Sequence, residues 1–196
     1  MNDLTIIFLT ANKVPEKWAE FQKQILLKAV GDTRIITISY KPLDWGDNIL
    51  QTEYSVPNLY RQILRGAKMA ETEYVAIAED DTLYPASHFT RRPEGIGYNL
   101  NRWIIFTWVE DLYFHKPMGA NGTMIAKRKD LIDKLGGKRY KEIEGEGFYT
   151  REPIVCFNHD YSIDELERKH HKMKPSVAAY DIPVWNSAKE LIKKFI

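Results

Sequence analysis

The sequence predicts an α/β fold with a mixed, mainly parallel central sheet flanked by helices. Short apolar runs rich in β-branched residues alternate through the first half of the chain with segments whose apolar residues recur at helical spacing. Strands joined through helices need crossover connections, and such connections produce parallel strand pairs. With 196 residues and 44% hydrophobic content, the chain can bury a sizeable core as a single domain spanning residues 1–196.

The first half is expected to contain three strands and two helices in alternation. The strands are expected at 4–9, 34–40 and 74–78. The first helix begins at Pro15 and ends at Gly31, and the second begins near Pro57. Residues 41–48 are rich in turn formers and predict a loop.

The second half is less regular, and its charged, glycine-interrupted stretch predicts a mobile loop. The expected order is strand 103–109, loop and strand 119–126, helix 130–135, mobile loop 138–152, strand 154–157 and helices 162–169 and 187–195.

Composition excludes several classes of protein. A net charge of +1 argues against a surface built entirely for nucleic acid, although it leaves room for a local basic patch. Cys156 is the only cysteine, so the chain has no intrachain disulfide and no cysteine-based zinc site. The first residues lack a basic segment, and the apolar run that follows is too short for a signal peptide or a membrane span. We therefore expect a cytoplasmic protein.

Three adjacent acids, Glu79, Asp80 and Asp81, directly follow the apolar strand expected at 74–78. Ligands of parallel sheets bind beyond the carboxyl ends of the strands, which is where these acids fall. Adjacent carboxylates repel each other unless a cation joins them, and Mg²⁺ and Mn²⁺ prefer oxygen ligands while leaving positions for substrate phosphates. The triplet indicates a metal site for a nucleoside diphosphate, and a solvated acidic turn is the alternative.

Several segments together resemble the small nucleotide-sugar glycosyltransferases of the Rossmann-like GT-A fold, family 2 type. They are Thr10-Ala11-Asn12, the helical segment 58–66, Ala78-Glu79-Asp80-Asp81 with Pro85 and Phe89, and Gly119-Ala120-Asn121-Gly122. The acidic triplet resembles the Glu-Asp-Asp form of the DxD motif. The resemblance implies a metal-dependent transfer of a sugar from a nucleoside-diphosphate sugar to a hydroxyl acceptor. It also implies that residues 1–115 bind nucleotide sugar and metal and that 116–196 form the acceptor half and tail.

The resemblance assigns roles to individual residues. Asp81 is implied to ligate Mn²⁺ or Mg²⁺, and Asp80 is implied to approach the metal or the donor ribose and to take part in catalysis. The implied donor-binding residues are Thr10, Ala11, Asn12, Glu79 and Asp80. Thr10 and Asn12 also suit a helix N-cap before Pro15, which is compatible with donor binding.

Two further sets of residues are candidates for the donor site. Arg61, Arg65 and Lys68 are spaced to share one helical face, which suits phosphate contact, although exposed cations on such helices are common. His159 follows the strand expected at 154–157 and resembles the late histidine that many GT-A enzymes supply to the metal. A structural or surface histidine is the alternative.

An inverting transfer needs a general base, and the candidates are Glu144 and Glu146, with Asp111 as a further candidate. The alternative is a solvated charged loop, which also fits a lid that excludes water from the donor. The basic run 168–174 suits the diphosphate or a polyanionic acceptor such as nucleic acid, and a solvated helix end is its alternative. Both a glycan and a modified nucleic acid are compatible with the sequence as the acceptor.

Two other classes of function remain. A nucleotidyltransferase shares the layout and the metal-binding carboxylates, but it normally has a glycine-rich basic loop after the first strand, which residues 10–15 lack. A noncatalytic nucleotide- or carbohydrate-binding module is the other, and the intact acidic triplet argues against it.

Overall fold

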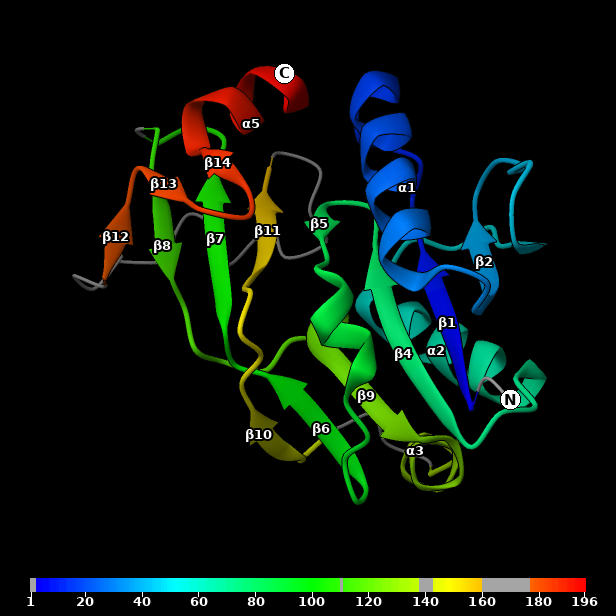
Figure 1. Cartoon of the computed structure of the whole chain (residues 1–196). Helices are drawn as coiled ribbons and strands as arrows, with labels where there is room; N and C mark the ends of the chain where they lie inside the picture. The colour runs from blue at the N-terminus through cyan, green and yellow to red at the C-terminus, as the bar shows by residue number, and fades with distance from the viewer. Residues whose placement is uncertain (1–2, 110, 138–142, 160–176) are drawn as a thin grey trace.

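A computed structural model of the chain describes residues 3–109, 111–137, 143–159 and 177–196 (Figure 1). Its centre is a seven-stranded sheet in the order β10-β6-β9-β4-β1-β2-β3. The strands are β1 Leu4–Leu9, β2 Arg34–Ser39, β3 Asp47–Leu50, β4 Tyr74–Glu79, β6 Ile96–Asn99, β9 Met124–Lys127 and β10 Glu146–Phe148. The helices are α1 Glu16–Val30, α2 Val56–Met69, α3 Arg128–Leu135 and α5 Ala188–Phe195.

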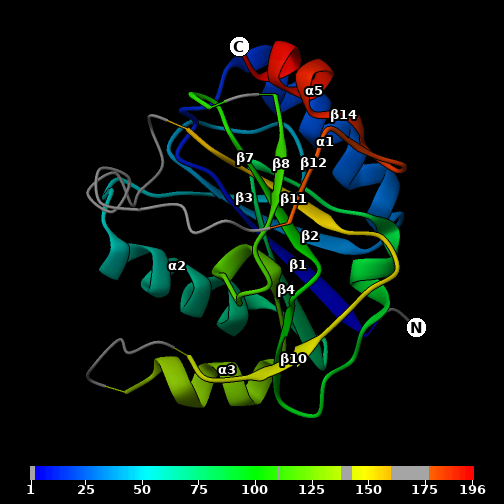
Figure 2. The ribbon, with the colours of Figure 1, turned by 90° about the vertical axis from the view of Figure 1, so that its left-hand side faces the viewer.

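The large sheet is mixed and mainly parallel. Strand β1 pairs in parallel with β2 and β4, and β2 pairs in parallel with β3. Strand β9 is antiparallel to both of its neighbours, β4 and β6, whereas β10 is parallel to β6. Figure 2 shows α1 on one side of this sheet and α2 and α3 on the other. The predicted α/β class is confirmed.

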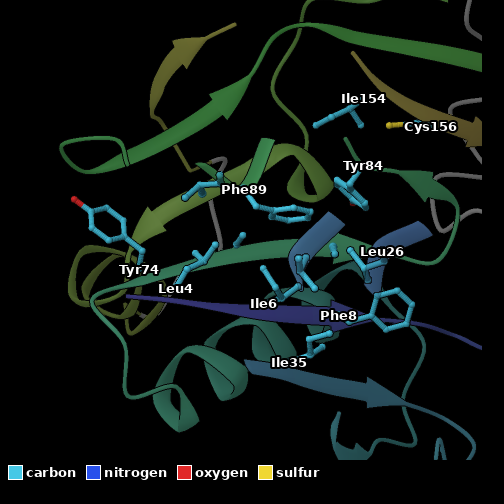
Figure 3. Packing of buried hydrophobic residues seen from close by; sticks show 14 of the residues in the cluster. Leu4, Ile6, Phe8, Leu26, Ile35, Tyr74, Tyr84, Phe89, Ile154 and Cys156 are labelled. Carbon is cyan, nitrogen blue, oxygen red and sulfur yellow. The ribbon is translucent and has the colours of Figure 1, made fainter. Parts of the chain in front are cut away.

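Alternating side chains of the central strands form two hydrophobic layers. Leu4, Ile6 and Phe8 pack under α1 together with Tyr84 and Phe89, as Figure 3 shows. The intervening residues of β1 pack instead against α2 and α3. Close packing of α2 requires a glycine, because a Cβ on Gly66 would lie 2.7 Å from Cγ2 of Ile7. The two faces of the sheet are therefore both buried, as expected for a parallel sheet.

A second sheet of five strands, not foreseen from the sequence, lies beside the first. Its order is β12-β8-β7-β11-β5, and a two-stranded ribbon, β13-β14, adjoins it. The strands are β5 Thr82–Leu83, β7 Arg102–Phe106, β8 Tyr113–His115, β11 Ile154–Asn158, β12 Ala178–Ala179, β13 Asp181–Ile182 and β14 Asn186–Ser187. Short 3₁₀ turns occupy Ala86–Thr90 and Asn121–Thr123. Trp18 of α1, Phe157 of β11 and Phe195 of α5 pack together on one face of this sheet.

Three predicted segments differ from the structure. The loop expected at 41–48 already contains the start of β3, whose polar residues lie at the edge of the sheet. The loop expected at 138–152 contains β10, and the strand expected at 103–109 ends at Phe106, where the Val109 N–H donates to the Phe106 carbonyl in a turn. The helix expected at 162–169 lies outside the described residues. Among the described helices, none is long and apolar enough to cross a membrane.

Candidate functional site

The acidic triplet lies at the carboxyl edge of the large sheet, as predicted. The parallel register pairs Leu9 with Glu79, so the residues that follow, Thr10 and Asp80, leave the sheet side by side. The Thr10 hydroxyl donates a hydrogen bond to Oδ2 of Asp80. The Asn12 N–H in turn donates to the Thr10 hydroxyl, with 2.8 Å between the atoms. The end of β1 therefore orients one of the three carboxylates.

Asn12 has a structural role in this loop. Its side-chain oxygen accepts the N–H groups of Tyr40 and Lys41, each at 2.9 Å, which fastens the loop to the end of β2. Its φ of 52° lies in the left-handed region that asparagine tolerates. The predicted N-cap role is wrong, because Pro15 occupies the N-cap position of α1 and makes no side-chain cap. Asn12 is not among the residues that line the cavity described below.

The second sheet brings His159 to Asp81. Strands β5 and β11 pair antiparallel, and the Phe157 N–H donates to the Asp81 carbonyl at 2.8 Å. As a result, Nε2 of His159 lies 3.8 Å from Oδ2 of Asp81, with side chains only 7% and 22% exposed. The other carboxylate oxygen of Asp81 accepts a hydrogen bond from the Thr82 hydroxyl at 2.8 Å. These contacts set a carboxylate and an imidazole next to each other.

Glu79 is enclosed by the glycine-bearing loop. A Cβ added to Gly122 would lie 2.6 Å from Oε2 of Glu79 and 3.0 Å from Oη of Tyr84. The Glu79 N–H donates to the same tyrosine oxygen at 3.0 Å. A larger residue at position 122 would therefore force the Glu79 carboxylate, the Tyr84 hydroxyl or the loop to shift.

These elements surround a cavity of about 810 Å³. The predicted site residues that line it are Thr10, Ala11, Glu79, Asp80, Asp81, Glu144 and His159. Its volume falls within the range of small-molecule and cofactor sites, roughly 300–1,000 Å³. The fold thus brings residues from both halves of the chain to one cavity.

Besides Asn12, five predicted site residues lie outside the cavity lining. Arg61 pairs with Glu53 at 2.5 Å, and Arg65 donates to the Leu50 carbonyl at 3.2 Å. Lys68 is exposed on the same helix, which turns Leu59, Tyr60 and Gln62 toward the cavity instead. The remaining two are acids: Glu146 accepts the Glu94 N–H at 3.1 Å, and Asp111 lies 3.9 Å from Lys189. The basic run 168–174 lies outside the described residues.

Three cavity-lining cations escaped the sequence analysis: Lys13, Arg102 and Lys116. Lys13 follows directly after the predicted donor-binding residues, which was a usable signal, and its Nζ lies 3.7 Å from the centre of the Tyr54 ring. Arg102 begins β7 and donates to Sγ of Cys156 at 3.4 Å. No local sequence pattern indicates that Arg102 or Lys116 belongs to the site. They reach it through the pairing of β7 with β8 and β11, which joins distant segments of the chain.

Ionisation of Asp80 and Asp81 is unfavourable in this environment. Burial, and then the neighbouring Asp81 carboxylate, raise the pKa of Asp80 to about 7, against the opposing hydrogen bond from Thr10. Burial also raises the pKa of Asp81, while His159 opposes that shift. Adjacent, partly buried carboxylates that resist ionisation are suited to share a cation, because its charge replaces the lost hydration.

The donor set fits a divalent cation that is completed by its substrate. Within the described ranges, no three histidine, cysteine, aspartate or glutamate side chains are grouped so as to hold a metal by themselves. Asp81 and His159 would supply protein ligands, leaving the other positions to phosphate oxygens and water. Mg²⁺ sites commonly have this composition, and Mn²⁺ accepts both oxygen and imidazole ligands.

Comparison with known proteins is informative at the level of fold. No protein-family model matches the chain, and no curated protein matches it. HddC from Yersinia pseudotuberculosis is 13% identical, with a TM-score of 0.51, over 87% of this chain and 99% of that chain. The inositol-1-phosphate CTP transferase from T. maritima is 14% identical, with a TM-score of 0.47, over 98% and 96%.

The bifunctional IspDF from Campylobacter jejuni is 12% identical, with a TM-score of 0.46. The similarity covers 73% of this chain and 45% of that one. At such identities, the likeness to HddC supports the α/β fold and nothing finer. The resemblance to family 2 glycosyltransferases gains no support from these structures.

Proposed function

We propose that this protein is a transferase that binds a nucleoside phosphate together with Mn²⁺ or Mg²⁺, and that the group it transfers is a sugar. One observation carries the proposal: Asp80, Asp81 and His159 line the same cavity as a candidate base, Glu144. The cavity also contains cations that suit a diphosphate, namely Lys13, Arg102 and Lys116. The acidic turn, the cations and the base are groups that suit an inverting glycosyl transfer from a nucleoside-diphosphate sugar.

In the proposed glycosyl transfer, each of these cavity residues has a specific role. Asp81 and His159 would hold the cation, whose charge would stabilise the leaving diphosphate. An acceptor hydroxyl oxygen bonds to the anomeric carbon of the sugar as the bond from that carbon to the diphosphate oxygen breaks, and the electron pair leaves with the diphosphate. Glu144 takes the proton of the hydroxyl. The acceptor is a hydroxyl compound, with glycans and modified nucleic acids as the classes to test.

Nucleotidyl transfer is the second candidate. It needs the same cation-binding carboxylates, and the three cavity-lining cations also suit a triphosphate. The names of the similar structures include a CTP transferase and so favour this reaction over glycosyl transfer. Against it, the loop after β1 has no glycine, and the N–H of Asn12 is already bonded to Thr10. That loop offers less backbone for cradling a triphosphate.

Binding and product analysis test the proposal. Calorimetry with nucleoside diphosphates, triphosphates and nucleotide sugars should show binding that requires Mn²⁺ and that Asp81→Asn abolishes. Asp133→Asn, on the exposed surface of α3, is the matched control and should bind as the parent protein does. Binding that is independent of the metal and unchanged in Asp81→Asn would overturn the site.

Products then separate the two reactions. Glycosyl transfer releases a nucleoside diphosphate from a nucleotide sugar when glycans, peptides or hydroxymethylated DNA are supplied as acceptors. Nucleotidyl transfer instead releases pyrophosphate from a nucleoside triphosphate and a sugar phosphate. Pyrophosphate release without any sugar transfer would replace the first candidate by the second.

A further inference from the structure

Helix α1 contributes two buried polar side chains that touch the acidic turn from outside the cavity. Trp18 and Gln22 are 0% and 1% exposed, and neither lines the cavity. The indole Nε1–H of Trp18 donates to the carbonyl of Asp80 at 2.8 Å. The amide Nε2 of Gln22 donates to the carbonyls of Glu79 and Thr82, at 3.3 and 3.1 Å.

Together with one backbone bond, these contacts occupy every carbonyl of the turn. The Asp81 carbonyl accepts the N–H of Phe157. The other three, those of residues 79, 80 and 82, accept hydrogen bonds from α1. Buried carbonyls need such partners, because an unpaired one loses its hydration without compensation. The backbone of the turn is therefore held by side chains that are separate from those that face the cavity.

The orientation of Gln22 shows that this arrangement is specific. Both of its acceptors are backbone carbonyls, so its amide nitrogen must face them. This orientation of the amide leaves Oε1 of Gln22 buried without a hydrogen-bond partner among the described residues. A buried, unpaired oxygen is unfavourable for stability. A leucine or methionine here would avoid this cost but would provide no donor to the turn.

Trp18 also connects the turn to the second half of the site. Its ring packs against Phe157 and Phe195, with centroids 4.4 and 4.9 Å apart. Phe157 precedes His159 by two residues and bonds the Asp81 carbonyl. One side chain of α1 thus contacts both the acidic turn and the strand that carries the histidine.

We propose that Trp18 and Gln22 are positioning residues of the transfer reaction, which fix the backbone of residues 79–82 so that Asp80 and Asp81 present their carboxylates to a cation-bound nucleotide. This inference rests on the proposed function. Helix α1 acts through hydrogen bonds to the main chain, so it orients the carboxylates without touching substrate. The substitutions that separate this role from ordinary packing remove the donors while keeping an apolar side chain in the same place.

Trp18→Phe and Gln22→Met are the test variants. Phe21→Leu is the matched control, because it loosens the packing around Trp18 without removing a hydrogen bond to the turn. We expect both test variants to bind Mn²⁺ with a nucleoside diphosphate at least tenfold more weakly than the parent. Phe21→Leu should lower the melting temperature and leave that affinity within about twofold. Parent-like affinity in both test variants, or an equal loss in the control, would overturn the inference.

Amide hydrogen exchange without ligand separates this inference from the proposed function. The amides of residues 80–82 should exchange at least tenfold faster in Trp18→Phe and Gln22→Met than in the parent, and at the parent rate in Phe21→Leu. Unchanged exchange in the test variants would overturn the positioning role even if the parent binds nucleotides. A parent that binds no nucleotide with Mn²⁺, yet shows the faster exchange in its variants, would instead overturn the proposed function.

Discussion

The hydroxyl of Thr10 donates a hydrogen bond to the carboxylate of Asp80, and this contact joins two residues that are 70 positions apart in the chain. It forms because β1 and β4 are parallel neighbours in register, so that both residues emerge from the same edge of the sheet. The acidic turn is therefore oriented by the loop of an adjacent strand as well as by its own sequence.

Replacing Thr10 by valine should weaken metal-dependent nucleotide binding by about tenfold. Valine keeps the shape of the side chain but removes the donor to Asp80, and hydrogen bonds to charged groups contribute about 1.5–3 kcal/mol. Calorimetry with Mn²⁺ and a nucleoside diphosphate measures the effect. The control is Thr90→Val, whose exposed hydroxyl bonds the Ser87 carbonyl. Equal affinity in Thr10→Val and Thr90→Val would contradict the role given to this contact.

Alanine at position 122 should destabilise the protein and impair the site. Its Cβ would approach Oε2 of Glu79 to 2.6 Å, so the Glu79 carboxylate or the loop must shift. We expect a loss of about 1–3 kcal/mol in the free energy of unfolding, as for other overpacked sites, and weaker nucleotide binding. Gly137→Ala is the control, because its Cβ would have 3.8 Å to its nearest neighbour, the Lys134 carbonyl. Urea unfolding of both variants makes the comparison.

The two candidate bases should differ in their effect on turnover. Glu144 lines the cavity, whereas Glu146 is bonded to the Glu94 N–H at the edge strand β10. Glu144→Gln should lower the turnover number by 10²-fold or more, which is the usual contribution of a positioned acid or base, while donor binding persists. Glu146→Gln should retain turnover. The reverse order of the two rates would assign the base to Glu146.

His88 should make the folded protein sensitive to acid. Burial lowers the pKa of this fully enclosed histidine to about 3, from its usual value near 6.5. Between these two values the unfolded chain binds a proton that the folded chain does not, so stability is complete above about pH 6.5 and declines as the pH falls. The decline contributed by His88 should reach about 2–3 kcal/mol at pH 4.5.

Urea unfolding at pH 7.5 and 4.5 checks this expectation. His88→Phe should reduce the loss of stability between these pH values, because phenylalanine has no proton to bind and suits the aromatic neighbours Tyr84, Phe89 and Phe148. His115→Gln, at a partly exposed position, should reproduce the acid response of the parent. A parent-like loss of stability in His88→Phe would show that other groups cause the response.

Local sequence patterns determined the framework of this protein. The apolar runs at 4–9, 34–40 and 74–78 predicted the three central parallel strands, because a strand buried on both faces needs a continuous apolar sequence. The acids after the third run were placed at the carboxyl edge by the same argument. Edge strands such as β3 and β10 escaped prediction, since they are short and polar and depend on a neighbour for pairing.

Only the tertiary structure decided which residues meet at the cavity. Arg61 and Arg65 share a helical face as predicted, but packing of Ile63 and Gly66 into the sheet sets the rotation of α2 and directs Gln62 to the cavity instead. His159 reaches Asp81 through the pairing of β5 with β11. The sequence by itself determined the strands and the acidic turn, because both depend on neighbouring residues in the chain. The partners of that turn depend on pairings between distant segments, which no local pattern specifies.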